Sequence, residues 1–85
     1  MHIAKDSLRF RILSLLAFRQ WAGKSGKVRT KDIAKELGVD RKCVNDECEA
    51  MDVLGWVKME RGIMGDFSIS IEPKGELILK ETESG

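Results

Sequence analysis

The stretch that decides the fold runs over residues 30–57 and reads TKDIAKELGVDRKCVNDECEAMDVLGWV. Its first part predicts a short helix over residues 31–37, with Thr30 as the N-cap. Asp32 falls in the first turn, where the positive end of the helix dipole favours an anion. Gly38 follows the last turn and can adopt the left-handed backbone conformation that ends many helices. We therefore expect a tight glycine turn after this helix.

The second part of the stretch predicts a longer helix over residues 41–54, capped by Asp40 and ended by Gly55. The small Ala34 in the preceding helix allows the two helices to cross closely. Apolar residues recur along one side of the longer helix: Val44, Cys48, Met51 and Leu54. This spacing is typical of a helix that buries one face, so we expect these side chains in the core.

The residues before the stretch predict a first helix over about 7–21, which ends near Gly23. One apolar stripe on it consists of Leu8, Ile12, Leu13, Leu15 and Leu16. A second apolar set lies on another side: Ile3, Phe10, Ala17 and Trp21. A helix that is apolar on two sides needs two packing partners. We expect one to be the core and the other to be the C-terminal helix or a second subunit.

The residues after the stretch change from a helical period to a period of two. A strand is predicted over 56–60, and apolar residues alternate with polar ones over 66–72. Glycines between them mark the turn of a β-hairpin. Pro73 then starts a last helix, where its missing N–H costs nothing, and Leu77, Ile78 and Leu79 give that helix its apolar surface. Only the tail 81–85 is expected to be disordered.

The predicted fold class is mainly α with a small β-hairpin, and its element order closely resembles the winged helix-turn-helix family. The resemblance covers nearly the whole chain as one domain, residues 1–85. The helix-turn-helix occupies about 30–54, the wing about 56–72 and the C-terminal helix about 73–82. The segment IEPKGEL at 71–77 resembles the start of the helix that follows the wing in MarR-like and PadR-like regulators.

The resemblance implies a sequence-specific DNA-binding transcriptional regulator, similar to the small repressors of prokaryotes, their plasmids or their viruses. In that family the third helix enters the major groove and the wing contacts the flanking backbone. Carried onto this sequence, Arg41 pairs with guanine, Asn45 with adenine, and Lys42 contacts phosphate. The full set of implied DNA-binding residues is Thr30, Lys31, Arg41, Lys42, Cys43, Asn45, Asp46 and, at the wing, Arg61.

The charge distribution keeps a second interpretation open. Residues 1–42 carry a net charge of +7 and residues 43–85 a net charge of −6. The predicted third helix is itself acidic, since residues 40–52 hold five acids and two bases. Ile63 and Met64 are apolar at the wing tip, where cations are common. The alternative is therefore a winged-helix interaction module whose acidic third helix docks a basic protein partner.

Composition excludes several other classes of function. The two cysteines, Cys43 and Cys48, lie about 140° apart on a helix, and His2 is the one histidine, so we expect no metal site. No nucleophile–base pair is present, so we expect no enzymatic activity and no cofactor. No membrane span, signal peptide or small-molecule site is evident. We expect a cytoplasmic homodimer that associates through the first and last helices.

Overall fold

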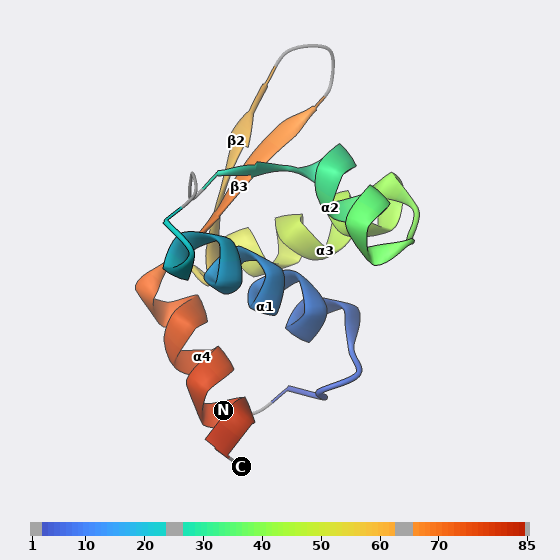
Figure 1. Ribbon diagram of the computed structural model, residues 1–85. Coiled ribbons are helices and arrows are strands. Elements are labelled where there is room, and N and C mark those ends of the chain that lie inside the picture. The colour runs from blue at the N-terminus through green and yellow to red at the C-terminus, as the bar shows by residue number, and fades with distance from the viewer. Residues whose placement is uncertain (1–2, 24–26, 63–65, 85) are drawn as a thin grey trace.

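The computed structural model describes residues 3–23, 27–62 and 66–84. The elements follow the predicted order, and Figure 1 shows their arrangement. They are α1 (Leu8–Trp21), β1 (Val28–Arg29), α2 (Thr30–Leu37), α3 (Arg41–Val53), β2 (Val57–Arg61), β3 (Phe67–Ile71) and α4 (Pro73–Ser84). The fold class predicted from the sequence is confirmed: a mainly helical chain with a small antiparallel sheet, in the order of a winged helix.

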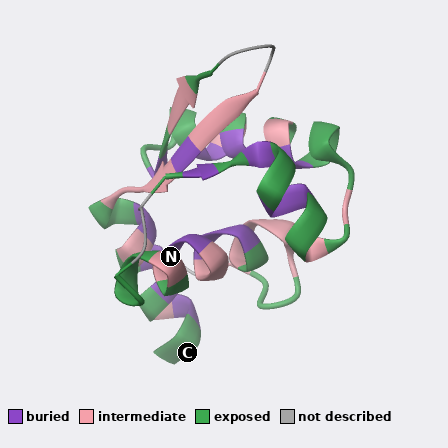
Figure 2. Cartoon of the chain, turned by 45° about the horizontal axis from the view of Figure 1, so that its top comes forward, coloured by how far each residue is buried: buried purple, intermediate pink, exposed green. Residues whose placement is uncertain are grey.

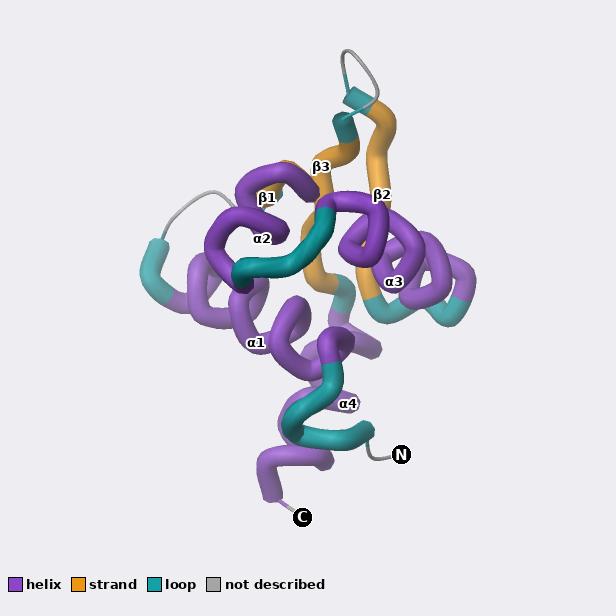
Figure 3. The backbone as a smooth tube through the Cα atoms, turned by 90° about the vertical axis from the view of Figure 1, so that its right-hand side faces the viewer, coloured by secondary structure: helices purple, strands orange, loops and turns teal. Residues whose placement is uncertain are grey.

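The sheet has three antiparallel strands in the order β1-β3-β2, so β3 lies between the other two (Figure 3). In the register, Ile69 of β3 pairs with Val28 of β1 on one side and with Met59 of β2 on the other. Ile69 is fully buried, as the alternation of apolar and polar residues in this strand predicts. The pairing of β1 with β3 joins the segment before α2 to the hairpin.

The core lies where α1, α2 and α3 meet one face of the sheet, and Figure 2 shows buried residues on each of these elements. Its fully buried apolar side chains are Ile12, Leu13, Leu16, Ile33, Val44, Cys48, Met51, Val57 and Ile69. The predicted core face of α3 is confirmed for Val44, Cys48 and Met51. Burial of this set is the main source of stability in the fold.

Local sequence signals set most of the helix ends. Ser7 is the N-cap of α1, and its hydroxyl accepts a hydrogen bond from the N–H of Phe10 at 3.2 Å. Gly38 ends α2 with a φ of 68° and Gly55 follows α3 with a φ of 80°, a region in which side chains other than glycine are strained. Pro73 begins α4, as predicted.

Leu54, which the sequence placed in the core, and Leu77, which it placed on the apolar surface of the last helix, are both exposed. Leu54 is 40% exposed because α3 ends at Val53, and because a residue ten positions after Val44 lies about 80° around the helix from it. Leu77 is 55% exposed, since the buried side of α4 carries Gly75, Ile78, Leu79 and Thr82 and residue 77 faces away from it.

The N-cap of α2 and the C-terminal tail also differ from the predictions. Arg29 is the N-cap of α2, and Thr30 is its first helical residue and is fully buried. The tail is helical as far as Ser84, whereas disorder was expected there. Its helix is anchored because Thr82 is buried and its hydroxyl accepts a hydrogen bond from the N–H of Ile3 at 3.2 Å.

Candidate nucleic-acid interface

The pairing of β1 with β3 brings the start of α2 against the wing. Arg29 pairs with Ser68 across the strands. The next residue, Thr30, donates a hydrogen bond from its hydroxyl to the carboxylate of Asp66 at 3.3 Å. Asp66 lies just before β3, and its carbonyl accepts a 2.7 Å hydrogen bond from the N–H of Gly62. These contacts fix the wing relative to the helix-turn-helix.

A cleft of about 540 Å³ lies between the wing and the starts of α2 and α3. Three exposed cations line it, Arg29 before α2, Lys31 in α2 and Arg41 at the start of α3. The hydroxyl of Ser68 adds a hydrogen-bond donor, and Asp66 places one carboxylate in the same cleft. An excess of positive charge beside two helix N-termini is an environment that favours phosphate.

The first turns of α3 present four of the predicted contacts to solvent: Arg41, Lys42, Cys43 and Asp46. Asn45 lies in the same turns of α3, between a buried and an exposed residue, and is half-buried. Its side-chain oxygen is buried and has no hydrogen-bond partner within the described residues. An amide that is not satisfied inside the protein retains its capacity to bond an external donor after a small rotation.

The remaining predicted contacts divide into one on the surface and one in the interior. Arg61 is exposed at the end of β2, next to Gly62, which lines the cleft. Thr30 is fully buried, so its side chain does not lie on the surface where the sequence placed it. Its hydroxyl instead donates to Asp66, and the contact of Thr30 with the DNA backbone stays a prediction that its side chain does not serve. Ile63 and Met64 lie outside the described residues.

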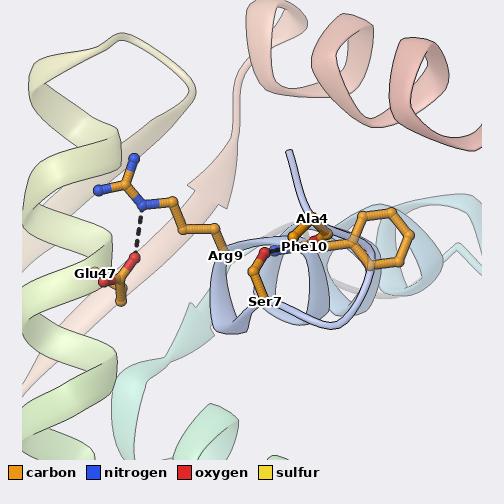
Figure 4. Close-up of polar contacts among 5 residues, drawn as sticks. All are labelled: Ala4, Ser7, Arg9, Phe10 and Glu47. Carbon is orange, nitrogen blue, oxygen red and sulfur yellow. Dashed lines mark hydrogen bonds and ion pairs between the residues drawn. The ribbon is translucent and has the colours of Figure 1, made fainter. Parts of the chain in front are cut away.

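The arginines of α1 are engaged with the helix-turn-helix. Arg9 forms an ion pair with Glu47 of α3 at 2.6 Å (Figure 4), and its guanidinium lies over the ring of Trp56. Arg19 pairs with Glu36 of α2 at 3.0 Å, and Arg11 donates to the carbonyl of Leu37 at 2.9 Å. These three cations therefore position α2 and α3, although the sequence counted them in the basic half of the chain.

The ion pair with Arg9 also changes the charge of α3. Glu47 was one of the five acids that argued against DNA, and Arg9 neutralises it locally. The exposed acids that remain within α3 are Asp46, Glu49 and Asp52. The exposed cations of α3, Arg41 and Lys42, stand at its N-terminal end, so the positive charge lies beside the cleft. Glu49 and Asp52 lie further along the helix.

Arg29 and Ser68 line the cleft but are not among the contacts that the sequence singled out. Their signals were present, since Arg29 directly precedes the predicted helix and Ser68 falls on the polar side of the alternating strand. What was missing is the pairing of β1 with β3, because two residues at Val28–Arg29 are too few to show a strand period.

The buried thiol of Cys48 is not a reactive centre. Burial, with a smaller contribution from the charge of Glu47, raises the pKa of Cys48 to about 12. Its thiol therefore behaves as a small apolar core group. Within residues 3–23, 27–62 and 66–84, no three His, Cys, Asp or Glu side chains gather where they can hold a metal ion. Nor does any helix in those ranges have the length and apolar character to cross a membrane.

Comparison with known proteins supports the fold at the level of architecture. No family model matches the sequence, and no curated protein does. Among solved structures, the chain is similar to the YusO protein from Bacillus subtilis, with a TM-score of 0.74 and 13% sequence identity. The match covers 89% of this chain and 51% of the other, so this chain spans about half the length of that protein.

Proposed function

We propose that this chain binds double-stranded DNA and regulates transcription. The observation that carries the proposal is the cleft between the wing and the helix-turn-helix, where Arg29, Lys31 and Arg41 converge. A duplex presents a row of phosphates, and contacts from cations and helix N-termini supply much of the affinity of a protein for DNA. The proposed role is one of binding, without catalysis.

In the proposed mode the N-terminal end of α3 enters the major groove. Arg41 and Asn45 then reach base edges, with Lys42 on phosphate, and Arg61 of the wing contacts the flanking backbone. Glu49 and Asp52 favour a shallow approach, since a helix lying along the whole groove would bring these exposed acids close to phosphate. Entry by the first turns keeps the acids clear of the backbone.

Binding is tested by fluorescence anisotropy with mixed-sequence duplex DNA at two salt concentrations. We expect micromolar binding at low salt that weakens as salt rises. Arg29→Ala and Lys31→Ala should each weaken binding to every DNA sequence. Each should also lower the slope of log affinity against log salt concentration by about one. Lys74→Ala removes an exposed cation from α4 and serves as the control with no expected effect. Absence of binding at micromolar protein in low salt would exclude the proposal.

Sequence reading by Asn45 is tested after enrichment of a preferred site from random duplexes. Asn45→Ala should reduce the preference for that site by about 1–3 kcal/mol and leave binding to mixed DNA nearly unchanged. An equal loss of affinity for the preferred site and for mixed DNA would show that Asn45 makes no direct contact with a base.

A second candidate function is favoured by the other end of α3. Val53 is 83% exposed there, close in sequence to the exposed acids Glu49 and Asp52. An apolar residue bordered by acids fits a basic protein partner. The double charge reversal Glu49→Lys and Asp52→Lys discriminates the candidates. DNA binding should improve or stay level, whereas docking of a basic partner should be lost.

A further inference from the structure

Asp46 points straight out from α3, away from the core. It lies about 160° around the helix from Val44 on one side and about 160° from Cys48 on the other, and both of those side chains are fully buried. Lys42 and Cys43 lie about 40° and about 60° from Asp46, and all three are exposed. Asp46 is therefore the central side chain on the exposed face of the first turns of α3.

The carboxylate of Asp46 has no partner within the part of the chain that the structure describes. It forms no hydrogen bond or ion pair there, not even with Lys42, which lies one turn before it on the same face. The next residue, Glu47, differs in this respect, since it pairs with Arg9 at 2.6 Å. The carboxylate of Asp46 is thus available to a hydrogen-bond donor outside the protein.

The chemistry of the major groove restricts which base can supply that donor. A carboxylate accepts hydrogen bonds and donates none. Guanine presents two acceptors in the major groove, thymine an acceptor and a methyl group, and adenine an acceptor beside its amino group. Cytosine presents its N4 amino group with no acceptor beside it. Cytosine is therefore the base whose edge is complementary to a carboxylate.

We infer that Asp46 specifies a cytosine in the target site, by accepting a hydrogen bond from the N4 amino group. The inference rests on the proposed function, in which the N-terminal end of α3 enters the major groove and its exposed face meets the base edges. Phosphates repel Asp46 on every sequence, and the bond to cytosine offsets this repulsion at one base. The acid thus weakens binding to other sequences and increases discrimination. Lys42, on the same face, balances its charge near the backbone.

The first test enriches target sites from random duplexes with wild type, Asp46→Asn and Asp46→Ala. Wild type should enrich a cytosine at one position. Asp46→Asn should enrich adenine there instead, because an asparagine amide pairs with N6 and N7 of adenine, and Asp46→Ala should show no preference at that position. Asp52→Asn is the matched control, since it makes the same change at an exposed acid further along α3 and should keep the cytosine. Circular dichroism verifies that each variant folds.

The second test measures affinity for the enriched site when the specified cytosine is replaced by N4-methylcytosine. The methyl group leaves pairing with guanine possible but takes the place of the amino hydrogen that faces the major groove. In fluorescence anisotropy, wild type should lose about 10-fold or more in affinity for the methylated duplex. Asp46→Ala should bind the methylated and unmethylated duplexes equally.

The outcomes separate the inference from the proposed function. A wild type that is insensitive to the methyl group, or a cytosine preference that Asp46→Ala retains, overturns the inference and leaves DNA binding in place. So does an equal gain of affinity for every sequence in Asp46→Ala, which would make the acid a general repellent of DNA. Failure of wild type to bind any duplex overturns the proposed function, and the inference with it.

Discussion

Gly75 in the first turn of α4 lies directly against the carbonyl oxygen of Trp56, so closely that a β-carbon at this position would overlap that oxygen. The same carbonyl accepts a hydrogen bond from the N–H of Glu72 at 2.9 Å. The start of α4 is therefore packed on the backbone that enters β2. This contact sets where α4 leaves the sheet.

Gly75→Ala should destabilise the protein although alanine is the better helix former. The added methyl group requires a shift of backbone, and we expect a loss of about 1–3 kcal/mol in the free energy of unfolding. Urea denaturation followed by circular dichroism measures the loss. Lys74→Ala, at the exposed neighbouring position, is the control and should change stability by less than about 0.5 kcal/mol. Equal stability of the two variants would contradict the close approach.

The sequence predicted the elements and the main core because its periodic signals are strong. It could not predict Gly75, since a close approach between residues 56 and 75 leaves no trace in a local pattern. Leu54 and Leu77 were misplaced because apolar character alone does not show which side of a short helix faces the core. The helical tail was missed because its anchor is a contact between Ile3 and Thr82, at opposite ends of the chain.

The candidate site was predicted less completely than the fold. The surface positions Lys31, Arg41 and Lys42 follow from helix order. Thr30 was assigned to the surface because threonine is a common N-cap, whereas its hydroxyl is used inside the protein on Asp66. The cleft depends on strand pairing across 39 residues, from Arg29 to Ser68, which local reasoning does not reach.

Asp66→Asn should strengthen binding to mixed-sequence DNA. The carboxylate of Asp66 lies in a cleft with three cations and opposes the entry of phosphate, whereas an amide keeps an oxygen for the hydroxyl of Thr30. We expect a decrease of roughly 3- to 10-fold in the dissociation constant at low salt, which shrinks at high salt. Asp6→Asn, an exposed acid that does not line the cleft, should leave affinity unchanged. Weaker binding by Asp66→Asn would show that the carboxylate supports the interface.

Arg9→Ala should cost more stability than Arg19→Ala. Both arginines form an ion pair from α1 and both are about a third exposed, so solvent screens each pair. Arg9 alone of the two also lies over Trp56, at 5.8 Å from the ring centre. We expect losses of about 1 kcal/mol for Arg9 and about 0.5 kcal/mol or less for Arg19.

A double-mutant cycle of Arg9→Ala with Glu47→Gln isolates the ion pair from the ring contact. The coupling free energy should be below about 1 kcal/mol, with the rest of the Arg9 effect retained in the Glu47→Gln background. Equal losses of stability for Arg9→Ala and Arg19→Ala would show that the contact of Arg9 with the ring of Trp56 contributes nothing to stability.

The thiol of Cys48 should make stability fall in alkali. The unfolded thiol ionises near its ordinary value of 9.0, whereas burial keeps the folded thiol protonated to about pH 12. The folded state therefore holds a proton that the unfolded state has lost, so the free energy of unfolding decreases as pH rises above 9. Below that pH the contribution is complete.

The measurement is urea denaturation between pH 8 and pH 10.5, values chosen to bracket roughly the ordinary ionisation of a thiol. Relative to wild type, Cys48→Ala should lose up to about 1.4 kcal/mol per pH unit of this dependence. Cys43→Ala removes the exposed thiol and should keep the wild-type slope. Parallel pH curves for wild type and Cys48→Ala would contradict the raised pKa.

The position of α1 has a consequence for how signals pass through the molecule. Its arginines hold α2 and α3, while its Phe18 and Trp21 line an apolar groove on the side of α4. If DNA binds at the cleft and the homodimer predicted from the sequence covers this groove, both contacts act on one helix. Thermodynamic linkage then requires reciprocity: whatever factor self-association changes in the affinity for DNA, DNA changes in self-association. The fourteen-residue helix α1 is thus the structural element that contacts both sites and couples binding at one to binding at the other.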